Sequence, residues 1–123
     1  MIIGLGLDIV EIDRISSIYQ KHGARFSQKI LTKAEQQAIS QQKAVYLASR
    51  FAAKEATVKA LGTGFSQGIG FQDIEILNNN HGKPELHLKN KALEIFQQIG
   101  GKCLHLSITH SRFTAAAIVI VEG

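Results

Sequence analysis

A run of apolar residues near the end of the chain, residues 115–121, constrains the fold more than any other feature of this sequence. Side chains alternate between the two faces of a strand, so a strand that is apolar on both faces must be covered on both. We therefore expect residues 113–122 to form a central strand or a strand at a subunit interface. The run is far shorter than the roughly 20 residues that span a bilayer as a helix.

The length and composition predict one soluble domain over residues 1–123. Of the 123 residues, 45% are apolar and 20% are charged, and the chain contains a single proline. A domain of this size buries roughly two-thirds of its unfolded surface, so it needs no disulfide framework to fold. The single cysteine, Cys103, excludes an internal disulfide, and we expect it to be a buried core thiol. The N-terminus lacks the features of a secretion signal, which predicts a cytoplasmic protein.

Positive charge is concentrated in the first half of the chain. The formal net charge is +4, and residues 14–59 hold nine Lys and Arg residues against two acidic ones. From residue 60 onward the two signs balance, at five each. The first half is therefore predicted to face an anionic partner, and nucleic acid, a phosphorylated cofactor and an acidic protein all fit this asymmetry, as does a merely solvated basic face.

Local patterns predict a mixture of helices and short strands. A capping box formed by Thr32 and Glu35 begins a helix over residues 33–41. Further helices are predicted at 13–22, 44–61 and 89–101, and strands at 1–10, 71–77, 85–88, 102–109 and 113–122. The glycine-rich stretch 62–70 predicts a loop of unusual shape.

Asp8 is a candidate functional residue because it lies within a strand that is otherwise apolar. It shares a strand face with Gly4 and Gly6, whose missing side chains leave room either for a ligand or for close backbone packing. Aspartate is disfavoured inside strands and is seldom buried without a partner, so this position calls for a partner or a cation.

Glu55 is a second candidate because helical geometry puts it on an apolar arc with Ala48, Phe51 and Ala52. One interpretation is a surface pair with Lys59, one helical turn further on. The other is close approach of the first strand, which would join Asp8 and Glu55 into a two-carboxylate site suited to Mg²⁺, with Lys59 beside it for phosphate oxygens.

The five histidines form no zinc-binding pattern. His110, at a predicted turn between the last two strands, is the one histidine for which we consider a functional role, a structural role in the turn being the alternative.

These residues resemble the 4'-phosphopantetheinyl transferases. The resemblance rests on a two-part motif, Gly6-Leu7-Asp8 followed by residues 51–59 with the sequence FAAKEATVK. Residues 12–14, 61–64, 82–84 and 107–111 also fit that family, so the similarity covers essentially the whole chain.

The resemblance implies transfer of the phosphopantetheine arm of coenzyme A to a serine hydroxyl of an apo acyl carrier protein, in support of fatty acid biosynthesis. It implies that Asp8 and Glu55 bind Mg²⁺ with the coenzyme A pyrophosphate, and that Lys59 holds or protonates phosphate oxygens. It also implies a wider set of residues that bind coenzyme A: Arg50, Lys54, Gly64, Pro84 and His110. The first helix and the residues after it would dock the acidic carrier protein through Arg14, Lys21 and Arg25. The serine proton would pass either to Glu55 or to a metal-bound water.

The expected architecture is an α+β fold in which antiparallel strands pack against helices, assembled by resemblance as a homotrimer with active sites between subunits. Two other functions compete with this one. A nucleic-acid-binding module is favoured by the pI of about 9.4, but the chain is poor in aromatic residues, at 7%, and has no RNA-binding motif, so we expect no nucleic acid partner. A phosphatase or nuclease would share the carboxylate pair but lacks further acids for a second metal.

Overall fold

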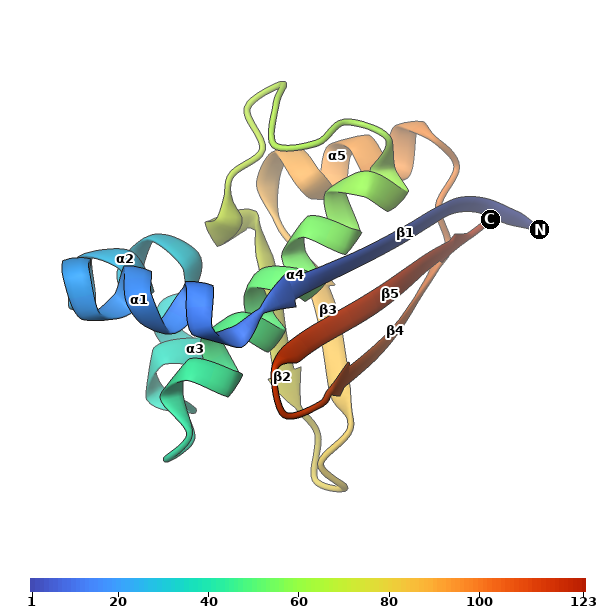
Figure 1. Cartoon of the computed structure of the whole chain (residues 1–123). Coiled ribbons are helices and arrows are strands. Elements are labelled where there is room, and N and C mark those ends of the chain that lie inside the picture. The colour runs from blue at the N-terminus through green and yellow to red at the C-terminus, as the bar shows by residue number, and fades with distance from the viewer.

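The computed structural model describes residues 1–123 and has the expected α+β architecture with antiparallel strands (Figure 1). The elements in chain order are β1 (Ile2–Glu11), α1 (Ile12–His22), α2 (Ala24–Ile30), α3 (Lys33–Gln37), α4 (Lys43–Leu61), the 3-10 turn η1 (Phe71–Asp73), β2 (Ile74–Asn78), β3 (Pro84–Leu88), α5 (Asn90–Gln98), β4 (Cys103–His110) and β5 (Thr114–Glu122). No helix combines the length and apolar character that a membrane crossing requires.

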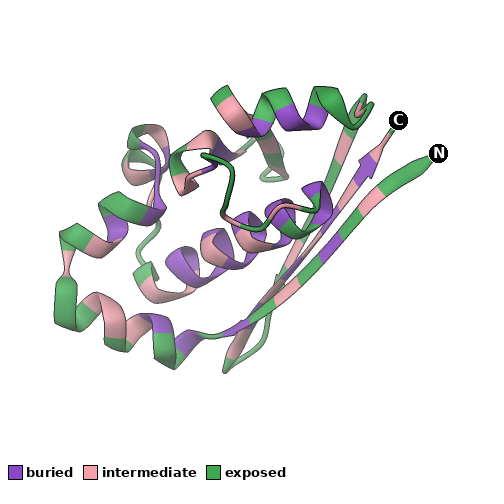
Figure 2. Cartoon of the chain, turned by 90° about the horizontal axis from the view of Figure 1, so that it is seen from above, coloured by how far each residue is buried: buried purple, intermediate pink, exposed green.

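The strands form two antiparallel sheets. One has the order β1-β5-β4, and the other is the hairpin β2-β3. The prediction of a central strand at the C-terminus is confirmed, since β5 lies between β1 and β4. Its inward side chains, Ala115, Ala117, Val119 and Val121, are buried beneath α4. Figure 2 shows the buried residues gathered along α4, at the centre of the molecule.

The helix α4 packs unusually close to β1 because two positions on the strand have no side chain. A Cβ atom added to Gly4 would overlap the carbonyl oxygen of Ala60, and one added to Gly6 would overlap that of Ala56. The space expected beside these glycines is thus filled by helix backbone. Of the two interpretations of the glycines, close packing is correct, since no room for a ligand remains next to Gly4 and Gly6 themselves.

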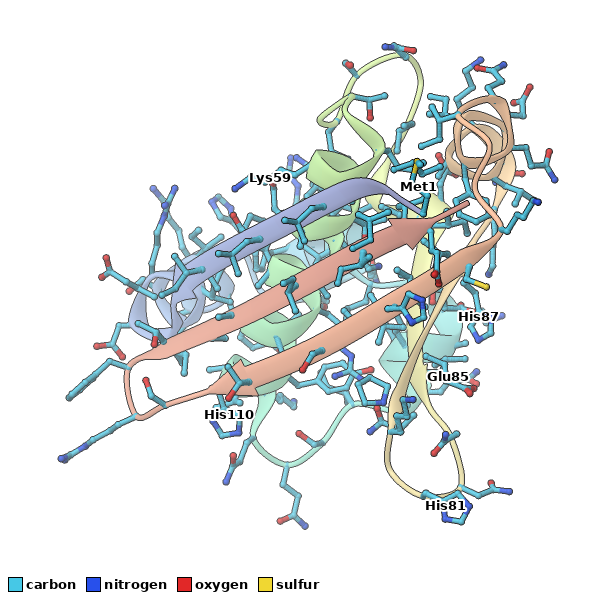
Figure 3. All side chains as sticks on the ribbon, turned by 90° about the vertical axis from the view of Figure 1, so that its right-hand side faces the viewer. Met1, Lys59, His81, Glu85, His87 and His110 are labelled. Carbon is cyan, nitrogen blue, oxygen red and sulfur yellow. The ribbon has the colours of Figure 1, made fainter.

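The opposite face of the same sheet is apolar and exposed. Leu5, Leu7 and Ile9 on β1 are 60%, 63% and 67% exposed, and Leu5 and Leu7 lie across from Ile120 and Ile118 of β5. Figure 3 looks onto this face. The chain by itself leaves one side of its main sheet uncovered, which is typical of an interaction surface.

Several local predictions need correction. The helix from the capping box ends at Gln37 rather than at residue 41, and α2 was not predicted at all. Residues 71–73 form a 3-10 turn before the strand begins. Cys103 is exposed at the start of β4, so its prediction as a core thiol is wrong. The capping box itself is confirmed, with Thr32 and Glu35 each accepting from the other's backbone N–H.

Candidate active site

The contact between α4 and β1 brings Asp8 and Glu55 together. Asp8 extends from the glycine side of β1, and Glu55 is half-buried on the adjacent face of α4. Burial raises the pKa of the Glu55 carboxyl, the negative charge of Asp8 raises it further, and Lys59 opposes both. Because Asp8 acts on Glu55 in this way, the two carboxylates share one electrostatic site, as the pairing hypothesis requires.

Lys59 completes this cluster by pairing with Asp8. Its Nζ donates to Asp8 Oδ1 at 3.0 Å and to the carbonyl oxygen of Leu7 at 3.0 Å. The alternative, an ion pair between Lys59 and Glu55 along the helix, does not form. The Lys59 side chain is 51% exposed, so its ammonium group is free to move from Asp8 to another anion nearby.

The donor set of this cluster fits Mg²⁺. Carboxylate oxygens are hard ligands, and Mg²⁺ is usually held by one or two carboxylates, with water and substrate phosphates supplying the rest. The cluster has two such carboxylates, and the chain has no group of three or more side chains of the kind that forms a closed metal cage. The Lys59 ammonium against Asp8 shows that this carboxylate accepts a cation at this position.

Arg50 lies in a different environment, where α4 meets the hairpin of β2 and β3. The guanidinium stacks over the Tyr46 ring at 4.4 Å and donates to Asn78 Oδ1 at 3.3 Å. Asn78 in turn lies across from Pro84 in the hairpin. Arg50 is only 8% exposed, yet its Nε has no hydrogen-bond partner.

The structure contradicts the prediction that Lys54 binds coenzyme A. Its side chain is completely buried, and its three N–H donors are taken by Glu35 Oε1 at 2.6 Å and by the carbonyl oxygens of Ile30 at 2.6 Å and Phe71 at 3.1 Å. An ammonium group has three donors, so none remains for a ligand. Lys54 is therefore part of the interior rather than of a binding surface.

Gly64 and His110 are both exposed. Gly64 follows α4 in the glycine-rich loop, where it has a positive φ of 61° and its N–H donates to the carbonyl oxygen of Val58. His110 ends β4, whereas Asp8 and Lys59 lie at β1, so the two groups occupy opposite edges of the three-stranded sheet (Figure 3). Pro84 lines a groove of about 390 Å³ between β3 and β4.

The predicted docking residues Arg14, Lys21 and Arg25 are exposed on α1 and α2. Between these helices lies a cleft of about 370 Å³, where Arg25 and Lys29 are accompanied by the apolar side chains of Ile18 and Phe26. The sequence analysis missed this cleft because it did not predict α2. The spacing of Phe26 and Ile30, one helical turn apart, was the available signal.

Comparisons with known proteins show which family the chain is similar to. The sequence profile of the 4'-phosphopantetheinyl transferase superfamily matches residues 4–117. A holo-[acyl-carrier-protein] synthase of Maridesulfovibrio salexigens is 54% identical over 123 residues, covering 99% of both chains. The crystal structure of the synthase from Neisseria meningitidis has a TM-score of 0.92 at 37% identity and covers both chains completely. The synthase of Helicobacter pylori in complex with coenzyme A has a TM-score of 0.86 at 30% identity, covering 96% of this chain and 99% of that one.

The profile match, the full-length similarity and the two-part motif around Asp8 and Glu55 agree with one another. The chain belongs to the 4'-phosphopantetheinyl transferase superfamily.

Proposed function

We propose that this single-domain chain, residues 1–123, transfers the 4'-phosphopantetheine group of coenzyme A to a serine hydroxyl of an apo acyl carrier protein. The observation that carries the proposal is the cluster of Asp8, Glu55 and Lys59 in a chain similar over its full length to holo-[acyl-carrier-protein] synthases. The serine oxygen forms a bond to the β-phosphorus of coenzyme A. The bond from that phosphorus to the bridging oxygen breaks, and adenosine 3',5'-bisphosphate leaves.

Asp8 and Glu55 are the proposed ligands of Mg²⁺. When bound, the ion neutralises the pyrophosphate charge and aligns the reacting oxygen with the phosphorus. Glu55 is the proposed acceptor of the serine proton, because its carboxylate lies beside Asp8 at the point where the serine would meet the phosphate. A water molecule is the alternative acceptor. Lys59 would turn from Asp8 to the phosphate oxygens and stabilise the charge that develops on the leaving group.

The nucleotide end of coenzyme A is assigned to Arg50, Gly64, Pro84 and His110. A guanidinium can bind two phosphate oxygens at once, which suits Arg50 to a phosphate group of coenzyme A. Pro84 borders the neighbouring groove and offers an apolar surface to an aromatic base. Gly64, directly after the helix that carries Glu55 and Lys59, lies in a loop whose backbone can approach phosphates closely.

We further propose that the active enzyme is a homotrimer with sites between subunits. The carboxylate cluster at β1 and His110 at the end of β4 lie at the two edges of the sheet, and a ring would place the β1 edge of one chain beside the β4 edge of the next. A contact between unlike edges is heterologous and closes into a ring when the rotation between subunits allows it. The exposed apolar face around Leu5, Leu7 and Ile9 supplies a surface for this assembly.

Arg14, Lys21 and Arg25 are the proposed docking site for the acidic carrier protein, with the apolar floor of the cleft between α1 and α2 beside them. Reversing the charge in Arg14→Glu should weaken carrier-protein binding at least about tenfold while changing coenzyme A binding less than about twofold. Calorimetric titration of each ligand measures both values. Equal losses for the two ligands would contradict the docking role.

The test of the overall proposal is the intact mass of an apo acyl carrier protein after incubation with this protein and coenzyme A. With Mg²⁺ present, the carrier protein should gain roughly 340 Da, the mass of one phosphopantetheine arm, and an identical sample with EDTA should gain nothing. A gain in both samples would exclude the metal requirement. No gain with several carrier proteins would leave only the shared fold.

A further inference from the structure

Lys54 directly precedes Glu55 on α4, but it contributes nothing to the accessible surface of the site. Its ammonium group joins three other parts of the chain: α2 through the carbonyl oxygen of Ile30, η1 through that of Phe71, and α3 through the Glu35 carboxylate. These contacts leave no N–H of the ammonium unused. They also attach the centre of α4 to segments on the side of the helix away from β1.

Glu35 extends the same network to two further backbone groups. Oε1 accepts from the backbone N–H of Thr32 at 2.7 Å in addition to Lys54, and Oε2 accepts from the backbone N–H of Ile76 on β2 at 2.8 Å. Both side chains of the pair are completely buried. Because every strong donor and acceptor is matched, each bond restricts the direction as well as the distance of its partner.

The side of α4 that faces β1 has few protruding side chains. The helix approaches β1 through small residues, Ala56 and Ala60 against Gly6 and Gly4, which permit close contact but provide few protruding side chains to interlock. A buried ion pair seldom stabilises a protein more than an apolar pair of similar volume would. Its best-attested use is to fix the position of one element relative to another. The network around Lys54 supplies the directional contacts that the alanine surface lacks.

We propose that the buried pair Lys54–Glu35 is a positioning device that fixes the rotation and axial position of α4, and so holds Glu55 opposite Asp8. Lys54 touches neither coenzyme A nor the reacting atoms. It acts through the helix that carries Glu55 and Lys59. The inference rests on the proposed roles of Asp8 and Glu55 in the transfer reaction.

The test compares two variants of similar stability. Lys54→Met/Glu35→Gln removes both charges together, so no lone charge is left in the interior and the chain should fold. Ile95→Ala truncates a buried side chain on α5 without touching the network, and serves as the control for lost stability. Thermal unfolding of both variants checks that their stabilities are similar. For each, kcat and KM are measured at saturating Mg²⁺, together with the Kd of coenzyme A by calorimetry.

The double variant should lose about 100-fold in kcat, the scale expected from a misplacement of about 1 Å, while KM and the Kd for coenzyme A change less than about twofold. The Ile95→Ala control should keep kcat within about twofold. The conservative variant Lys54→Arg keeps the charge, but its guanidinium cannot bond to three acceptors that surround a single nitrogen. Its kcat should therefore also fall below the wild-type value.

Three results would overturn the proposal. An equal loss of kcat in the Ile95→Ala control would show that the Lys54–Glu35 pair affects the rate only through the stability of the fold. A rise in the Kd for coenzyme A as large as the loss of kcat would make Lys54 a ligand contact after all. Unchanged kcat in the double variant would remove the positioning role. If instead the proposed active site is wrong, the variant Asp8→Ala will remain active, which separates that failure from a failure of the positioning role.

Discussion

At the scale of single residues, environment rather than residue type separates the acidic groups of this chain. Asp8 pairs with the Lys59 ammonium, whereas burial and the charge of Asp8 both raise the pKa of Glu55. Glu35 is buried more completely than either, but it is matched by Lys54 and by backbone donors. Glu55 combines partial burial, a like charge nearby and access to the surface with a raised pKa, whereas the like charge beside Asp8 is offset by its contact with Lys59.

Removing either carboxylate of the cluster should abolish transfer. We expect Asp8→Ala and Glu55→Ala each to lower kcat at least about 1,000-fold, because two carboxylates are the protein's whole contribution to the proposed ion. The rate of mass gain of the carrier protein measures this. The surface variant Glu94→Ala on α5 is the matched control and should keep the normal rate. Turnover near the wild-type value in either carboxylate variant would disprove the metal assignment.

The raised pKa of Glu55 also predicts a dependence of stability on pH. A carboxyl whose folded pKa exceeds its unfolded value contributes stability that is complete below the unfolded pKa and is lost as pH rises through the folded pKa. Glu55→Gln should therefore stabilise the protein at pH 7, by no more than about 1 kcal/mol because solvent screens this half-buried site. The gain should disappear at pH values below the ordinary glutamate pKa. Urea unfolding at the two pH values measures it, and a variant less stable than wild type at pH 7 would contradict the assignment.

At the scale of elements, the site depends on the distance between one helix and one strand. The glycines of β1 let the backbone of α4 approach, and this approach brings Glu55 and Lys59 to Asp8. The polar network around Lys54 meets α4 away from that strand. The helix is thus located from two sides, by close backbone packing and by directional hydrogen bonds.

Adding one methyl group to this contact should damage both stability and activity. The Cβ of Gly6→Ala would overlap the Ala56 carbonyl oxygen, which is backbone and cannot rotate away. We expect a loss of about 3 kcal/mol or more in the free energy of unfolding, measured with urea. Gly70→Ala is the matched control, since its added Cβ meets nothing within 4 Å and its φ of −117° suits any residue. Equal stability of the two variants would show that α4 can retreat from the strand without cost.

At the scale of the whole molecule, the proposed ring would build each active site from the β1 edge of one chain and the β4 edge of its neighbour. The carboxylate cluster lies at the β1 edge and His110 at the β4 edge, and the apolar outer face of the sheet runs between them. A closed ring would cover that face and join unlike edges in the same step. The face also explains why the last strand is apolar on both sides even though α4 covers only one.

Mixing two inactive chains should therefore restore activity. Asp8→Ala removes one of the proposed half-sites, and His110→Ala removes the other. If every site joins two chains, co-expression in equal amounts leaves about one quarter of the sites intact, so the mixture should recover about a quarter of the wild-type rate. The rate of mass gain of the carrier protein reports this, with each inactive chain alone as the control. A mixture as inactive as its components would place both half-sites within one chain.

The sequence alone determined the features that depend on neighbours along the chain. The capping box at Thr32 and Glu35, the end of α1 at Gly23 and the strand character of residues 113–122 are all local signals, and the structure confirms them. The sequence indicated that Asp8 needs a polar partner, and the structure shows that this partner is Lys59.

Only the tertiary structure decided which partner each charged group found and which surface stayed open. Lys54 lies in the same motif as Glu55 and Lys59, yet its acceptors come from α2, α3 and η1, distant in sequence, so no local pattern could show that it is buried. The glycines of β1 were equally compatible with a ligand and with a helix. A periodic pattern gives the two faces of an element, but which face is covered depends on the elements that pack there, and those contacts are long-range.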